Sequence, residues 1–96
     1  MASFKRRVLV VDDSPLVCSI TREAIEKHSD YDCMSVLSAE EAIDKIYEYK
    51  PNLLVVDVDL PGVSGYEFVQ RVREDKRWEA VPVILLAEKN TAECMT

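Results

Sequence analysis

The run Leu53-Leu54-Val55-Val56-Asp57 constrains the fold more strongly than any other part of the chain. Four apolar residues lead directly into a carboxylate, and the turn residues Pro61, Gly62 and Gly65 follow shortly afterwards. A continuous apolar run of this length, bounded by turn residues, predicts a strand that is buried on both faces. Parallel α/β sheets built from such strands place their sites at the carboxyl ends of the strands. Asp57 is therefore the first candidate site residue.

The rest of the chain alternates between strand and helix patterns. Further strands are predicted at residues 8–11, 32–37 and 82–86. Helices are predicted after the N-cap serines Ser14, Ser38 and Ser64, ending near residues 29, 50 and 75, and another helix start appears at residues 90–93. This order predicts right-handed crossovers and a parallel sheet with helices on both faces.

The helical segments carry apolar stripes opposite their charged residues, as amphipathic helices packed on a sheet do. The stripes consist of Leu16, Val17, Ile20, Ala24 and Ile25 in the first helix, Ala39, Ala42, Ile43 and Ile46 in the second, and Phe68, Val69 and Val72 in the third.

Composition and charge exclude several classes of function. The 96 residues form one domain, and a formal net charge of −6 argues against a nucleic-acid-binding surface, which needs clustered Lys and Arg. The apolar run at 8–11 is too short for a signal peptide or a membrane span, so no membrane contact is expected. Cys18, Cys33 and Cys94 have neither metal-ligand nor redox spacing, which indicates reduced thiols in a cytoplasmic protein.

Two of the predicted buried strands end in carboxylates. Asp12 and Asp13 follow the strand at 8–11, and Asp57 ends the strand at 53–57. In a doubly wound sheet the first and third strands can be neighbours, about 4.8 Å apart, at the point where the winding reverses. The three carboxylates would then share a small cleft and raise one another's pKa, a conflict that a hard cation removes.

Mg²⁺ fits this arrangement, because it prefers oxygen ligands and binds through one or two carboxylates while keeping several waters. We expect Asp13 and Asp57 to ligate Mg²⁺ directly and Asp12 to hold it through water. A carboxylate beside such a site is suited to phosphoryl transfer, in which Asp57 would attack in line to form an acyl phosphate.

At this point the sequence resembles the receiver domain of two-component response regulators, the CheY-like family. The resemblance covers essentially the whole chain and rests on residues 8–14, 54–62, 65–67 and 82–86. It implies a flavodoxin-like α/β fold, with strand order 2-1-3-4 here and with the family's fifth strand and last helix missing. Residues 1–96 are therefore expected to form a C-terminally incomplete receiver domain.

The resemblance also implies roles for individual residues. Asp57 would accept a phosphoryl group from a histidine kinase or phosphotransfer protein, and Asp12 and Asp13 would serve Mg²⁺. The third protein contact to the metal would be the backbone carbonyl of Asp59, whose side chain would face the water that removes the phosphate. The implied protein is a signalling switch that catalyses only its own phosphorylation and dephosphorylation.

Two departures from the family pattern change these expectations. Ala87 stands where the family usually has Thr or Ser, and it cannot donate the hydrogen bond that couples the phosphoryl group to the switch. The family's active-site lysine and aromatic switch residue lie in the missing part. The alternative function is therefore a degenerate receiver that acts as a phosphorylation-independent interaction or dimerisation module.

Without a fifth strand, residues 82–86 would form an apolar sheet edge, and such edges pair or aggregate. We expect either a fragment of a longer regulator or a chain that completes its sheet by self-association through this edge.

Overall fold

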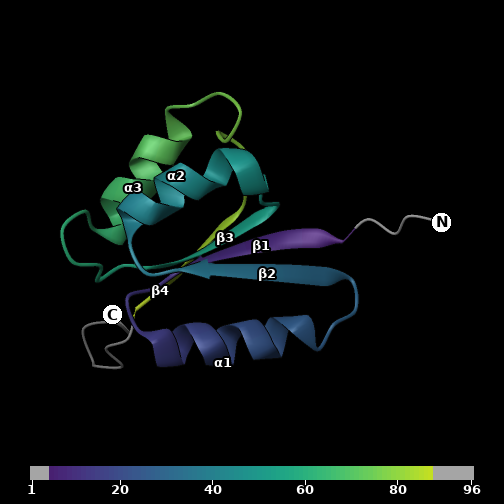
Figure 1. The fold of residues 1–96 in the computed structure, drawn as a ribbon. Helices are drawn as coiled ribbons and strands as arrows, with labels where there is room; N and C mark the ends of the chain where they lie inside the picture. Colours follow the sequence, from purple (N-terminus) through teal and green to yellow (C-terminus); the bar gives the residue numbers. More distant parts are fainter. Residues whose placement is uncertain (1–4, 88–96) are drawn as a thin grey trace, which may run out of the picture.

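The computed structural model describes residues 5–87, which alternate between strands and helices as predicted (Figure 1). The elements are β1 (Arg6–Val11), α1 (Pro15–Glu26), β2 (Tyr31–Val36), α2 (Ala39–Tyr49), β3 (Leu53–Asp57), α3 (Gly65–Arg73) and β4 (Val83–Leu86). The helix start predicted at residues 90–93 lies outside the described residues.

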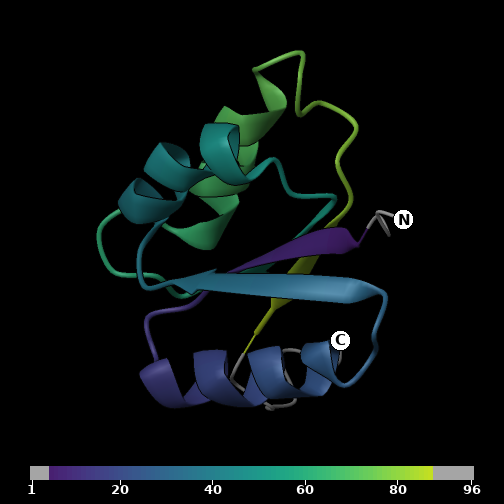
Figure 2. The ribbon, with the colours of Figure 1, turned by 45° about the vertical axis from the view of Figure 1, so that its right-hand side comes forward.

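The strands form one parallel sheet in the order β2-β1-β3-β4, which confirms the predicted topology. Helix α1 covers one face of this sheet, and α2 and α3 together cover the other (Figures 1 and 2). The central strands β1 and β3 are neighbours, so their carboxyl ends lie at the same edge of the sheet. This is the flavodoxin-like arrangement.

The three predicted N-caps are present. The hydroxyl oxygens of Ser14, Ser38 and Ser64 accept hydrogen bonds from the backbone N–H groups three residues later, at 3.2, 3.1 and 3.2 Å. These bonds satisfy helix donors that would otherwise lack a partner.

The ends of several elements differ from the prediction by a few residues. Helix α1 ends at Glu26 and α3 at Arg73, both earlier than expected. Strand β1 begins at Arg6, before the apolar run, because Arg6 and Arg7 pair with β2. Backbone pairing does not depend on an apolar side chain, so the polarity pattern could not locate this boundary.

Successive residues of the central strands point to opposite faces and form two separate cores. The larger core, beneath α2 and α3, contains Leu9, Leu54, Val56 and the fully buried Phe68. The smaller core, beneath α1, consists of five buried residues: Val8, Val10, Cys18, Cys33 and Val55.

The predicted inward stripe of α1 is only partly correct. Leu16 and Ile20 are 68% and 58% exposed, whereas Cys18 is the buried residue of this helix. One helix alone covers this face, and the side of α1 that carries Leu16 and Ile20 has no neighbouring helix among residues 5–87. Ile84 of β4, whose register partner Val55 belongs to the α1 core, is also half exposed.

Within residues 5–87, the helices are too short or too polar to cross a membrane.

Candidate functional site

The predicted carboxylates meet at one edge of the sheet. Asp12 follows the last residue of β1, and Asp57 is the last residue of β3. Because Val11 and Val56 are register partners, Asp12 and Asp57 stand side by side on neighbouring strands. Asp12, Asp13 and Asp57 each present a carboxylate oxygen, and these oxygens all lie within 4.8 Å of one another.

Asp12 is buried, with 1% of its surface exposed, and is fixed by several hydrogen bonds. Its Oδ1 accepts a bond from the Ser14 N–H at 2.9 Å. Its own N–H donates to the Val36 carbonyl at 3.1 Å, and the Cys18 thiol donates to its carbonyl at 3.3 Å. Strand β2 and helix α1 therefore both hold this residue. Asp13, by contrast, is exposed to solvent.

Asp57 is equally buried, but only one of its carboxylate oxygens has a protein partner. Oδ1 accepts the Asp59 N–H at 3.0 Å, while Oδ2 is buried without a hydrogen-bond partner. Burial raises the pKa of this carboxyl, and the negative charges of Asp12, Asp13 and Asp59 raise it further, although the Asp59 N–H opposes them. The site therefore disfavours the charge that Asp57 carries at neutral pH.

These residues fit a divalent cation of the Mg²⁺ type. All three side chains offer hard oxygen donors, and the buried Oδ2 of Asp57 needs a positively charged or hydrogen-donating partner. Two ligands of a Mg²⁺ octahedron lie about 3 Å apart when they are adjacent and about 4.2 Å apart when they are opposite. The three oxygens, which lie within 4.8 Å of one another, would move closer together to reach these spacings.

The other predicted site residues lie close by. Asp59 is exposed, two residues beyond Asp57, and its N–H holds the Asp57 carboxylate. Ala87 follows Leu86, the register partner of Asp57, and the Leu86 carbonyl accepts the Val58 N–H at 2.9 Å. The exposed methyl group of Ala87 thus stands at the end of the strand next to Asp57, without a hydroxyl to offer.

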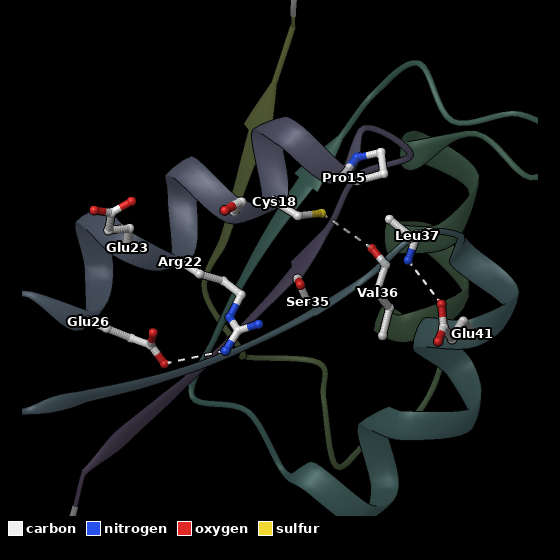
Figure 3. A pocket seen from close by; sticks show the side chains of 10 residues that line it. Pro15, Cys18, Arg22, Glu23, Glu26, Ser35, Val36, Leu37 and Glu41 are labelled. Carbon is white, nitrogen blue, oxygen red and sulfur yellow. Dashed lines mark hydrogen bonds and ion pairs between the residues drawn. The ribbon is translucent and has the colours of Figure 1, made fainter.

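A cavity of about 540 Å³ lies between α1, β2 and the start of α2, with Cys18, Arg22 and Ser35 in its wall (Figure 3). None of the three clustered carboxylates lines it. Three of the four charged side chains that line this cavity are engaged with one another or with the backbone: Arg22 pairs with Glu26 at 3.8 Å, and Glu41 accepts the Leu37 N–H at 3.0 Å. The carboxylate cluster is therefore a separate feature at the sheet edge.

Comparison with known proteins identifies the family. Residues 8–96 match the family model described as "Response regulator receiver domain". This chain belongs to that family. Receiver domains are the signalling modules of two-component systems. The match to the family model confirms the resemblance seen in the sequence motifs.

Individual relatives agree with this assignment. The chain is 34% identical over 82 residues to response regulator Rre1 of Synechocystis sp., a match that covers 85% of this chain but only 36% of the relative. The chain thus spans about a third of that protein's length.

Among solved structures, a putative response regulator from Chloroflexus aurantiacus superposes with a TM-score of 0.82 at 30% identity, over 94% of this chain and 73% of the other. The chemotaxis response regulator CheY4 of Vibrio cholerae superposes with a TM-score of 0.84 at 24% identity, over 94% and 74%. The second likeness concerns the fold alone.

One residue of this region has a contact that the sequence pattern did not predict. Gly65, the first residue of α3, is buried against the backbone of Asp57, with its N–H donating to the Val58 carbonyl at 3.2 Å. Glycine is a poor helix former, so its presence in the first turn of a predicted helix was a signal that packing requires it there.

Proposed function

We propose that this receiver domain accepts a phosphoryl group on Asp57, with Mg²⁺ held by Asp12, Asp13, Asp57 and the backbone carbonyl of Asp59. The observation that carries the proposal is the convergence of three carboxylates, two of them buried, within 4.8 Å. Burying like charges together is costly unless a cation or proton compensates them. Such a cluster at the carboxyl edge of a parallel sheet is therefore best explained as a metal-assisted site.

The two carboxylate oxygens of Asp57 have different environments, which suits a nucleophile. The Asp59 N–H fixes Oδ1 and so orients the group, while Oδ2 has no protein partner. An Asp57 oxygen attacks the phosphorus of a phosphohistidine. As the new O–P bond forms, the P–N bond breaks and its electron pair leaves with the imidazole. Bound Mg²⁺ supplies charge neutralisation for the phosphoryl group.

The proposed phosphodonor is a histidine kinase or a phosphotransfer protein, and the proposed role is a switch that catalyses only its own phosphorylation and dephosphorylation. We place the protein in the cytoplasm. The free thiols of Cys18 and Cys33, both buried, support a reducing compartment.

Incubation with a small phosphodonor and Mg²⁺ tests the proposal. The wild-type chain should gain the mass of one phosphoryl group, and Asp57→Asn should gain none. Omission of Mg²⁺ should abolish labelling in the wild type. Label that persists in Asp57→Asn would place the acceptor elsewhere. An unlabelled wild type would instead favour the degenerate receiver, the alternative for which Ala87 is the main argument.

We also propose that the chain self-associates through the edge of β4 that has no partner strand within residues 5–87. This strand pairs only with β3 among the described residues, and its Ile84 and Leu85 are 50% and 41% exposed. An apolar edge with unpaired backbone groups is a template for another strand. Sedimentation velocity should detect a concentration-dependent dimer, and Ile84→Lys should shift it to monomer. A monomeric wild type at all concentrations would contradict this proposal.

A further inference from the structure

Gly65 has almost no room for a side chain, because the backbone of Asp57 and Val58 lies directly against it. A Cβ atom at this position would overlap the Asp57 carbonyl oxygen, and it would lie 2.8 Å from the Val58 Cα and 2.9 Å from the Asp57 carbonyl carbon. Real Cβ atoms essentially never come closer than 3.0 Å to such neighbours. All three obstacles are backbone atoms, so no side chain can rotate away to make space.

The backbone that Gly65 touches also carries the functional groups of the site. The Asp57–Val58 peptide leads from the nucleophile toward Asp59, whose N–H holds Asp57 Oδ1. The same segment is tied to β4, because the Val58 N–H donates to Leu86, and to α3, because the Val58 carbonyl accepts the Gly65 N–H. Helix α3 thus supports this backbone from one side while β4 supports it from the other.

We propose that Gly65 is a positioning residue for the phosphoacceptor: the close approach of α3 sets where the Asp57 carboxylate stands relative to Asp12 and Asp13. Any side chain at position 65 forces the Asp57 carbonyl oxygen to retreat until it lies at least 3.0 Å from the new Cβ atom, or moves α3 by a similar amount. An octahedral Mg²⁺ site tolerates little displacement of its ligands. This inference rests on the proposed phosphoacceptor function.

A purely structural role for Gly65 makes a different prediction. In that case Gly65→Ala changes stability alone, and the folded protein keeps its affinity for Mg²⁺. Alanine is the better helix former, so helix propensity gives no reason for weaker metal binding.

The test compares Gly65→Ala with Gly62→Ala, the same substitution three residues earlier, in the loop before α3. Gly62 has a φ of +76°, so alanine strains the backbone there, but its Cβ would meet only the Glu40 side chain at 3.4 Å. Isothermal titration with Mg²⁺ is carried out under conditions in which circular dichroism shows that each variant is folded. Gly65→Ala should weaken Mg²⁺ binding about 10–100-fold and slow labelling at saturating Mg²⁺, whereas Gly62→Ala should keep wild-type affinity.

If Gly65→Ala does not fold, Ser64→Ala decides the question. This variant removes the N-cap bond to the Glu67 N–H and lets the first turn of α3 loosen without a clash. It should weaken Mg²⁺ binding several-fold.

If Gly65→Ala folds and binds Mg²⁺ as tightly as the wild type, the positioning role is overturned and the phosphoacceptor function stays intact. If only Ser64→Ala folds, unchanged Mg²⁺ affinity in that variant has the same meaning. A wild-type chain that neither binds Mg²⁺ nor accepts phosphate would overturn both.

Discussion

Two regions of the sheet differ sharply in how completely the described residues build them. The metal corner, formed by Asp12, Asp13 and Asp57, stands at the ends of the central strands β1 and β3, which are buried on both faces. The open flank, formed by Leu16, Ile20 and Ile84, exposes half or more of each of these apolar side chains. The groups that would bind metal and phosphate are thus held by buried strands, whereas no element within residues 5–87 covers the open flank.

The proposed phosphoacceptor reaction and any conformational response to it therefore involve differently supported parts of the sheet. Asp12 and Asp57 stand at the ends of the interior strands β1 and β3, each of which pairs with a strand on both sides within the described residues. At the end of β4, Ala87 offers no hydroxyl to a phosphoryl group on Asp57, and this strand is half exposed. We therefore expect substitutions in the two regions to have clearly different effects.

The largest effect should come from removing a side chain of the large core. Phe68 is fully buried beneath α3, so Phe68→Ala should lower the free energy of unfolding by about 3–5 kcal/mol. Leu16→Ala on the open flank should change it by no more than about 0.5 kcal/mol. Urea denaturation measures both. A large loss in Leu16→Ala would mean that this flank is covered in solution.

A smaller effect is expected from the charge of Asp57 in metal-free protein. Burial raises its pKa in the folded state above the ordinary value of 3.8, so the folded protein holds a proton that the unfolded chain releases. Stability should therefore fall as the pH rises from about 3.8 through the raised pKa, by at most about 1.4 kcal/mol per pH unit for this one group.

Denaturation of the chelated protein at several pH values checks this expectation. Asp57→Asn should flatten that part of the pH profile, and Mg²⁺ should oppose the loss because it binds the ionised form. A wild-type profile that matches the variant's would mean that burial and the neighbouring carboxylates do not raise the pKa of Asp57.

The smallest structural effect is expected at Ala87. The residue is exposed, so Ala87→Thr should change stability by no more than about 0.5 kcal/mol. The new hydroxyl can donate to a phosphoryl group on the neighbouring strand, so phosphorylated protein should accumulate faster than in the wild type. Ala87→Val, which has the same shape without the hydroxyl, is the control. Equal labelling of both variants would show that position 87 does not contact the phosphoryl group.

The sequence predicted the metal corner better than the flank, for a physical reason. Asp57 could be placed because a continuous apolar run fixes where a buried strand ends, and parallel pairing then brings its end beside Asp12. The orientation of α1 could not be predicted this way. Periodicity identifies a broad apolar stripe, but the neighbouring elements decide that Cys18 is buried and that Leu16 and Ile20 are exposed.

The role of Gly65 was hidden for a related reason. Its constraint is a contact with the backbone of Asp57, eight residues earlier, rather than a local turn or a positive φ. Sequence patterns report the conformation that a residue prefers, whereas this glycine is required by the space between two elements.

Calorimetric titration of the metal-free chain with Mg²⁺ at neutral pH tests the central claim most directly. Asp13→Asn is the most informative variant, because Asp13 is exposed and its loss should leave the fold unchanged. The wild type should show a single Mg²⁺ site, and Asp13→Asn should bind Mg²⁺ at least about tenfold more weakly. A wild type that binds no Mg²⁺, or an Asp13→Asn variant that binds it equally well, would contradict the assignment of the three carboxylates as a metal site.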